Sequence, residues 1–251
     1  MKKTSPKLKA EDESLDSFYK GRILVLQKKK GYRFAVDAPL LADFIRTKAA
    51  DEVLELGAGN GIISLLLSLK PLKHIIAVEI QETLADLARR NVRLNKLEDK
   101  ISAIRGDFRE YAPRKKFDVV FSNPPYIKKK TGYLSASPEK SIAKHEIKCD
   151  ILDVMRKTGE LLKANGKAYF IYPAKRQDDL LRAANKFGLK VRALRFIQPR
   201  EGEQANLVLA ECGFGVSSPR TLRPLIIYNK RGVYTLEVRK IFEGRRRGPA
   251  H

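Results

Sequence analysis

Short apolar runs alternate with longer amphipathic segments between residues 52 and 187. The apolar runs are VLEL at 53–56, IIAVEI at 75–80, ISAIR at 101–105, FDVVFS at 117–122 and GKAYFIYP at 166–173. Their nearly continuous apolar character is typical of strands that are covered on both faces. Helical spacing is found between them at 62–69, 84–94 and 151–162, and after Ala174 through Phe187. This alternation predicts an α/β fold with a parallel sheet and helices on both faces.

The pattern changes after residue 187, where two further apolar runs lie close together. KVRALRFI at 190–197 and ANLVLAEC at 205–212 are separated by the turn-rich QPREGEQ, which is typical of an antiparallel pair. A final segment, PLIIYNKRGVYTLEV at 224–238, indicates a hairpin that turns at 229–232. The whole pattern predicts a mostly parallel, seven-stranded sheet that ends in an antiparallel terminal hairpin.

The chain has 251 residues, of which 43% are hydrophobic, and this is enough apolar material for one sizeable core. We expect a flexible basic arm over 1–14, a single domain over 15–244 and a disordered basic tail over 245–251. No stretch approaches the roughly 18 apolar residues of a membrane helix, and no signal peptide is recognised. Cys149, Cys212 and the three histidines lack the spacing of metal ligands. We expect a cytoplasmic protein without a metal, and a monomer.

The charge balance of the chain points to a polyanionic partner. Lysine and arginine number 51 against 29 aspartates and glutamates, which gives a formal net charge of +22. Such an excess makes nucleic acid the leading candidate, although a basic surface can also serve solubility alone. Charge by itself indicates no reaction.

Glycines follow the first predicted strand in the run Glu-Leu-Gly-Ala-Gly-Asn-Gly at 55–61. Glycines at such a point permit a tight turn and let a ligand approach the backbone beside a helix N-terminus. The spacing differs from the GxGxxG of dinucleotide folds, and no Lys-Ser or Lys-Thr pair follows as in a phosphate-binding P-loop. On its own, the run also fits an ordinary turn from strand to helix.

Acidic residues end the next two predicted strands. Glu79 lies about 20 residues after Gly57, where an acidic residue binds ribose hydroxyls in nucleoside-binding βαβ units. Asp107 can accept a hydrogen bond from an adenine amino group, and Phe108 can lie against the ring. Together with the glycines, these residues predict an adenosine pocket without a phosphate clamp. Such a pocket favours S-adenosylmethionine over NAD or ATP.

The fourth predicted strand ends in Asn123-Pro124-Pro125-Tyr126. Two consecutive prolines stiffen the backbone and restrict where the Pro124 carbonyl and the Asn123 amide oxygen point. Both oxygens can accept from one planar amine, which favours a pyramidal, nucleophilic nitrogen without a strong general base. Tyr126 offers a face on which an unpaired base can stack. The tetrad therefore predicts methylation of a planar amine.

These motifs together resemble the class I, Rossmann-like methyltransferases of amino nitrogens. Within that class, GYRFAVDAPLLADFI at 31–45, AKHEI at 143–147 and the ending PLIIYNKRGVYTLEV resemble the bacterial valine-tRNA adenine N6-methyltransferases, which modify adenine 37 beside the anticodon. The resemblance implies methyl transfer from S-adenosylmethionine to the exocyclic N6 amine of an adenine in tRNA. It also implies that Phe34 and Asp37 close over the methionine end of the cofactor.

The expected site residues form three groups. The catalytic amine site comprises Asn123, Pro124, Pro125 and Tyr126. The expected cofactor contacts are Phe34, Asp37, Glu55, Gly57, Ala58, Gly59, Glu79, Ile80, Asp107, Phe108 and Asn123. Three adjacent cations, Lys128, Lys129 and Lys130, follow the tetrad and are expected to bind RNA phosphates, although a charge run is also typical of a solvated surface.

Three alternatives stay open at this point. Protein methyltransferases that act on glutamine side-chain amides of release factors share the tetrad, although they usually carry a separate helical N-terminal domain. Amine methylation of ribosomal RNA or DNA fits the same tetrad, because the tetrad reports amine geometry and not the identity of the polymer. A non-enzymatic RNA-binding protein would use the basic surface alone, but the intact tetrad and glycine run argue against it.

Overall fold

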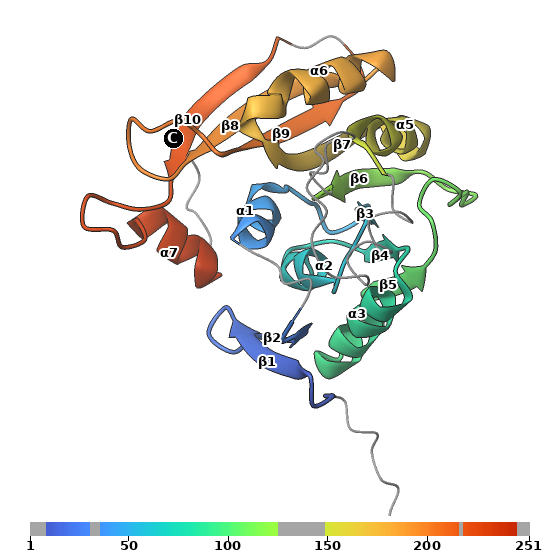
Figure 1. Cartoon of the computed structure of the whole chain (residues 1–251). Coiled ribbons are helices and arrows are strands. Elements are labelled where there is room, and N and C mark those ends of the chain that lie inside the picture. Colours follow the sequence, from blue (N-terminus) through green and yellow to red (C-terminus); the bar gives the residue numbers. More distant parts are fainter. Residues whose placement is uncertain (1–8, 31–35, 125–148, 216–217, 245–251) are drawn as a thin grey trace, which may run out of the picture.

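An eight-stranded sheet is the centre of the computed structural model, which describes residues 9–30, 36–124, 149–215 and 218–244 (Figure 1). Its strand order is β10-β8-β9-β7-β6-β3-β4-β5. The strands are β3 Glu52–Leu56, β4 His74–Glu79, β5 Ile101–Arg105, β6 Phe117–Ser122, β7 Leu162–Pro173, β8 Lys190–Gln198, β9 Leu207–Gly213 and β10 Arg220–Ile226. β9 runs antiparallel to both of its neighbours, and the other paired strands are parallel. The predicted α/β fold with a mostly parallel sheet and an antiparallel β8–β9 pair is confirmed.

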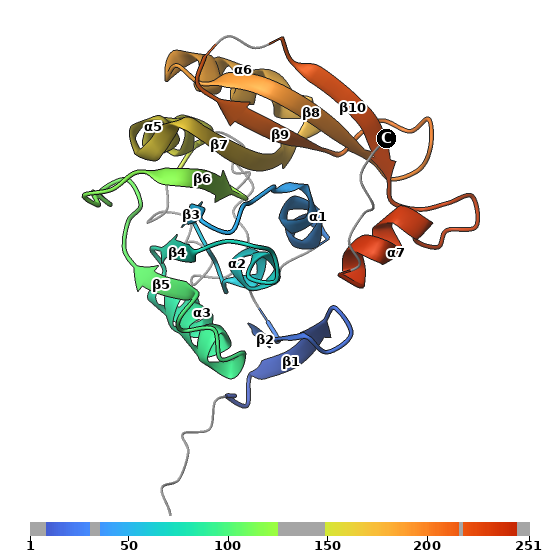
Figure 2. The ribbon, with the colours of Figure 1, turned by 180° about the vertical axis from the view of Figure 1, so that it is seen from behind.

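Helices cover both faces of this sheet (Figures 1 and 2). One face carries α1 Asp37–Phe44, α2 Ile62–Leu67, α3 Glu82–Leu94 and α7 Leu236–Phe242, and the other carries α5 Ile151–Leu161, η1 Ala174–Arg176 and α6 Gln177–Lys186. Successive strand residues alternate between the two cores, as Val53 and Leu54 do on β3. Because side chains on both faces of the sheet are buried, the strand sequences are apolar at nearly every position. None of the helices in these described ranges is long and apolar enough to cross a membrane.

The strand register brings the functional strand ends to one edge of the sheet. Val53 of β3 pairs with Ile75 of β4 on one side and with Val119 of β6 on the other. Ser122, the last residue of β6, donates its Oγ hydrogen to the carbonyl oxygen of Leu56 at 2.7 Å. The ends of β3 and β6 are therefore joined directly, at the edge where open parallel sheets bind ligands.

The C-terminal part of the chain differs from the hairpin expected over 224–238. β10 joins the main sheet as an eighth strand and runs parallel to β8, because the chain reverses after β9 and passes to the outer edge of β8. The expected turn is present, with Tyr228 and Tyr234 bridged and their rings stacked at 5.2 Å. Beyond it, the side chain of Thr235 accepts from the backbone N–H of Val238 and caps α7 where a strand was expected.

The N-terminal part of the chain forms a hairpin that the apolar pattern did not predict. β1 Glu13–Phe18 pairs with β2 Ile23–Lys28 as a separate two-stranded sheet, so strand structure begins within the expected arm. Glu13 is fully buried and accepts from Arg90 of α3 at 2.7 Å, and this bond lowers the pKa of Glu13 to about 2. The hairpin is therefore packed on α3.

Candidate functional site

The glycine loop, residues 57–61, makes a tight turn between β3 and α2. Gly57, Gly59 and Gly61 all have positive φ angles, of 76°, 58° and 81°, which residues with side chains rarely adopt. The N–H groups of Gly57 and Ala58 both donate to the carbonyl of Val78 on β4 at 3.0 Å. A Cβ placed on Gly57 would meet no atom within 4 Å among the described residues, so a ligand can approach its backbone.

Glu79 ends β4 and bridges the glycine loop to the start of α3. Its Oε2 accepts from the N–H of Gly59 at 2.7 Å, and its Oε1 accepts from the N–H of Gln81 at 2.8 Å. Burial raises the pKa of Glu79, while these backbone N–H groups oppose the rise. A carboxylate has about four acceptor positions, so Glu79 can also accept from the hydroxyls of a ribose at the strand end.

Glu55 of β3, an expected cofactor contact, is buried directly before the glycine loop. Its side chain is only 1% exposed and accepts a hydrogen bond from the hydroxyl of Ser64 on α2. Burial raises the pKa of Glu55 to about 8, and the neighbouring charge of Glu79 adds to the rise. The raised pKa favours the protonated form of Glu55 at neutral pH, and its hydrogen bond with Ser64 ties α2 to β3.

The raised pKa of Glu55 predicts a pH-dependent stability that Glu55→Gln should remove. Between pH 4.5 and about 8 the folded chain binds this proton and the unfolded chain does not, so the free energy of unfolding falls as pH rises. The slope from this group is at most about 1.4 kcal/mol per pH unit. Urea unfolding of both proteins at several pH values should show Glu55→Gln gaining stability relative to the parent toward pH 8. A constant difference between them across this window would contradict the assignment.

Asp107 and Phe108 follow β5 at the same edge of the sheet. Asp107 accepts from the Nε–H of Arg109 at 2.8 Å and from the backbone N–H of Arg109 at 2.9 Å. The Arg109 guanidinium lowers the pKa of Asp107, so this carboxylate is ionised and can act as an acceptor. Phe108 is 9% exposed and packs into the core on the α5 and α6 face. A Cβ on the preceding Gly106 would meet no atom within 4 Å among the described residues.

Asn123 follows β6, and its amide is oriented by a carboxylate from the start of α1. Its Nδ2 donates to Oδ2 of Asp37 at 2.8 Å, while Oδ1 of Asp37 accepts from the N–H of Ala38 at 2.9 Å. The bond turns the nitrogen end of the amide to Asp37 and thereby sets the direction of its oxygen. Pro124 is buried directly after it, and its ring restricts the backbone. Two of the four tetrad residues therefore lie at the expected strand end.

Asp37 should act on methyl transfer through Asn123. Asp37→Ala is expected to lower kcat about ten-fold, because the amide loses a charge-assisted hydrogen bond. Asp37→Asn keeps an acceptor and should recover part of the rate. The double variant Asp37→Ala/Asn123→Ala should be no slower than Asn123→Ala alone, since coupled residues are not additive. An additive loss, or a change confined to KM for the cofactor, would instead indicate a direct cofactor contact by Asp37.

The remaining expected residues divide into two sets. Ala58 is 5% exposed within the glycine loop, and the half-buried Ile80 follows Glu79 directly. Outside the described residues lie Phe34, Pro125, Tyr126, Lys128, Lys129 and Lys130. Within the described ranges, no group of three His, Cys, Asp or Glu side chains could hold a metal ion.

Asn91 of α3 is a site-supporting residue that the sequence interpretation missed. It is fully buried, and its Nδ2 donates to the carbonyl of Asn60 in the glycine loop at 3.0 Å and to that of Leu26 at 3.1 Å. Its Oδ1 accepts from the N–H of Leu26 at 2.7 Å, so one amide ties the loop to β2. The signal was present in the sequence, because Asn91 falls on the apolar stripe of α3 with Leu84 and Ala88.

This fold and the placement of these strand-end residues define a class I S-adenosylmethionine-dependent methyltransferase. A family model described as the methyltransferase small domain matches residues 33–167, which is more than half of the chain. The chain belongs to this methyltransferase family.

The sequence similarity to curated relatives extends beyond the residues that the family model matches. A Bacteroides thetaiotaomicron protein named tRNA1(Val) (adenine(37)-N6)-methyltransferase is 30% identical over 66% of this chain and 70% of its own length. A protein of the same name from Phocaeicola vulgatus is 29% identical over 82% of this chain and 86% of its own length. Another from Aeromonas hydrophila is 26% identical over 81% of this chain and 85% of its own length.

Solved structures share the fold. A protein of Agrobacterium tumefaciens described as a predicted O-methyltransferase aligns with a TM-score of 0.64 and 22% identity, over 83% of this chain and 96% of that chain. A protein of M. jannaschii solved in complex with AdoMet aligns with a TM-score of 0.54 and 19% identity, over 82% of this chain and 88% of that chain. At this level of identity, both establish the fold alone.

The residues present fit S-adenosylmethionine, the cofactor that the family implies. Among the described residues, nothing occupies the space beside the backbones of Gly57 and Gly106, so a nucleoside could approach there. The Glu79 carboxylate, the donors of the glycine loop and the ionised Asp107 supply polar groups at the same edge. Asn60 adds a buried Nδ2 donor that has no partner among the described residues.

Proposed function

We propose that this methyltransferase transfers a methyl group to the exocyclic N6 amine of an adenine in tRNA. The observation that carries the proposal is the bond from Asn123 to Asp37, which sets the direction of the Asn123 amide oxygen at the end of β6. The adjoining strand β3 leads into the glycine loop, so an amine held by Asn123 lies beside the cofactor edge. The names of the curated relatives support adenine as the base and tRNA as the polymer.

The cofactor is held through its adenosine moiety. When bound, S-adenosylmethionine would supply an activated methyl group: the sulfur–methyl bond breaks as the bond from N6 to the methyl carbon forms, S-adenosylhomocysteine leaves, and one amine proton is lost to solvent. Glu79 accepts from the ribose hydroxyls, Asp107 accepts from the adenine amine, and the backbone at Gly57 lets the cofactor approach the end of β3. Asn123 lies after β6, next to β3, so it would be close to a cofactor held by these groups.

The amine is activated by position and polarity. The lone pair of an adenine N6 amine is delocalised into the ring, which makes the nitrogen a weak nucleophile. Asn123 Oδ1 and the Pro124 carbonyl would accept the two amine hydrogens, which would favour a pyramidal nitrogen with an available lone pair. Asp37 keeps the Asn123 amide from rotating, so the acceptor is in place before the base arrives. Tyr126 of the tetrad provides the stacking face for the base.

The substrate is a polyanion, in keeping with the net charge of +22. Lys128, Lys129 and Lys130 follow the tetrad in the sequence and would bind phosphates that flank the inserted adenine. Position 37 of valine tRNA is the target that the names of the relatives suggest. Action on tRNA would place the protein in the cytoplasm.

The test is methyl transfer from labelled S-adenosylmethionine into unmodified total RNA, DNA and protein fractions, followed by analysis of the labelled product. The proposal expects label in the tRNA fraction, recovered as N6-methyladenosine. Label in a release factor as methylglutamine would establish the alternative that shares the planar-amine geometry. Label in ribosomal RNA or DNA would support the proposed methylation of an amine and would contradict tRNA as the substrate. No transfer to any fraction, with the cofactor bound, would contradict the proposal.

A further inference from the structure

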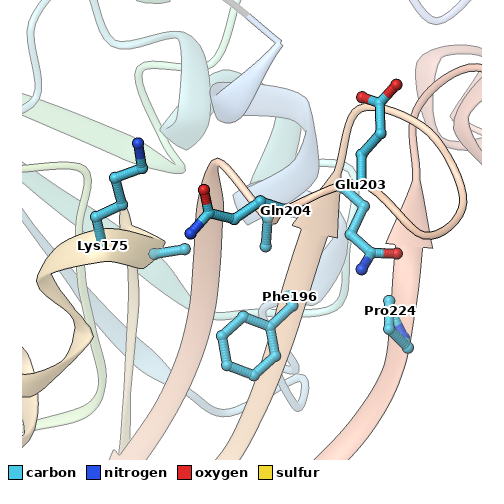
Figure 3. Close-up of a pocket in the computed structure, with 8 residues that line it drawn as sticks. Lys175, Phe196, Glu203, Gln204 and Pro224 are labelled. Carbon is cyan, nitrogen blue, oxygen red and sulfur yellow. The ribbon is translucent and has the colours of Figure 1, made fainter.

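A pocket of about 330 Å³ lies away from the cofactor strands, between η1, β8, the β8–β9 loop and β10 (Figure 3). Its walls include Lys175 of η1, Phe196 and Gln198 of β8, Gln204 of the loop, and Pro224 of β10. None of these residues belongs to the cofactor site or to the tetrad, so neither of those sites accounts for the pocket.

The pocket lies near the carboxyl ends of β8 and β10, at the same edge of the sheet as Asn123. β8 runs parallel to β7, because both are antiparallel to β9, and β10 runs parallel to β8. The ends of β8 and β10 therefore point the same way as the end of β6, which carries Asn123. β8 lies three strand spacings from β6, which is roughly 14 Å at about 4.8 Å per strand. A polymer bound at Asn123 can therefore reach the pocket with nucleotides that flank its target.

The lining suits a flat ring with polar edges. Phe196 is half-buried and Pro224 lies near it on the neighbouring strand (Figure 3), so these two residues supply an apolar surface. Gln198 and Gln204 carry amides, which both donate and accept hydrogen bonds. An aromatic face flanked by amides is the arrangement by which proteins bind unstacked nucleobases.

Lys175 lines the pocket, and two exposed arginines lie close in sequence to other lining residues. Lys175, Arg200 and Arg223 are exposed on η1, on the β8–β9 loop and next to Pro224. The loop also carries Glu203, but its carboxylate points away from the Phe196 ring in Figure 3 and pairs with Arg200 at 3.3 Å. A lysine at the rim of a pocket with an aromatic face matches a nucleotide, because the phosphate is anionic and the base is flat.

We propose that this pocket binds one unpaired nucleobase of the RNA substrate, stacked on Phe196, a few nucleotides from the methylated adenine. The proposal rests on the proposed function for the identity of the polymer. It gives the enzyme a second anchor, so that recognition does not depend on the target base alone.

The test introduces a fluorescent ring at the pocket. The chain contains no tryptophan, so Phe196→Trp would supply a single indole that reports on this site alone. Phe187→Trp is the matched control, because Phe187 is also half-buried, packs on the same core and lies at the far end of α6 beside Lys186. Unmodified valine tRNA transcript is titrated into both variants, and heparin serves as a polyanion without bases.

The expected result is that tRNA quenches the indole at position 196, that heparin does not, and that the control at position 187 does not respond. Phe196→Ala should weaken tRNA binding about ten-fold, with a raised KM for tRNA, nearly unchanged kcat and unchanged cofactor affinity. Phe196→Leu keeps the apolar bulk without the ring and should show the same loss. Thermal unfolding of each variant separates these effects from misfolding.

The pocket and the proposed function fail in different ways. Parental tRNA binding by Phe196→Ala, or an indole at position 196 that tRNA leaves unchanged, would overturn the pocket while adenine methylation by the parent still stands. Quenching at position 196 without any methylation of adenine would support the pocket and overturn the proposed function. A parent protein that binds no RNA would overturn both.

Discussion

Asn123→Ala is expected to slow methyl transfer about 100-fold or more while leaving S-adenosylmethionine affinity nearly unchanged. The side chain lies at the end of β6, and Asp37 holds its amide nitrogen at 2.8 Å, so the amide oxygen is preorganised as an acceptor. Alanine removes that acceptor but leaves the glycine loop and Glu79 intact. The loss should therefore fall on the chemical step and not on cofactor binding.

Single-turnover kinetics with saturating cofactor and substrate measure this step directly, and calorimetry measures cofactor affinity. Asn123→Asp is a second variant, in which a carboxylate would face the carboxylate of Asp37. It should also be slow, because like charges at this distance repel and disturb the acceptor geometry. Asn185→Ala, on the exposed part of α6, is the control and should behave as the parent does. Near-parental turnover by Asn123→Ala would exclude the proposed amine site.

Glu79→Gln should weaken S-adenosylmethionine binding by about 10- to 100-fold, since hydrogen bonds to charged groups contribute roughly 1.5–3 kcal/mol. Both oxygens of the Glu79 carboxylate accept from backbone N–H groups of the loop and of Gln81. An amide keeps one acceptor and places an NH2 group against one of these donors. The variant therefore loses a ribose acceptor and also disturbs the loop that receives the cofactor.

Glu82→Gln is the matched control for this experiment. Glu82 begins α3 only three residues later, but its side chain is 70% exposed and pairs with Arg105 at 3.1 Å. Its neutralisation should leave cofactor affinity at the parental value, because exposed ion pairs contribute little. Calorimetric titration with S-adenosylmethionine measures the cofactor affinity of both variants. Parental affinity in Glu79→Gln would show that the cofactor pocket is misplaced.

The central sheet could be predicted because its strands are covered on both faces. Val53 and Leu54 enter different cores, and the same holds for Phe121 and Val120 on β6. Such strands are apolar at nearly every position, which makes them recognisable in a sequence and also indicates the helices that cover them. Residues placed directly after these strands, including Glu79 and Asn123, were located for the same reason.

The two ends of the chain could not be predicted in this way, because their structure depends on tertiary contacts. β1 and β2 are stabilised by α3, where the Asn91 and Asn95 side chains bond to the backbone of Leu24 and Leu26. At the other end, the alternating residues before Thr235 resemble a hairpin, whereas burial of Val238, itself a residue of α7, favours a helix. The local propensity of these residues for helix or strand cannot predict either of these tertiary contacts.

In the candidate site, too, the positions of residues could be predicted from the sequence but their tertiary contacts could not. Motifs placed Glu55, Glu79 and Asn123 at strand ends, but their interactions come from partners distant in sequence. Asp37 was expected at the methionine end of the cofactor, and the structure shows its carboxylate bonded to Asn123. Glu55 was expected as a cofactor contact, and among the described residues its carboxyl accepts a hydrogen bond from Ser64 of α2.

The most direct measurement compares methylation of two valine tRNA transcripts that differ only at position 37, one with adenine and one with guanine. Both are incubated with labelled S-adenosylmethionine and the parent protein, and the products are digested to nucleosides. Adenine methylation at this position predicts label in the first transcript alone, recovered as N6-methyladenosine. Equal labelling of the two transcripts, or label in any other nucleoside, would contradict it.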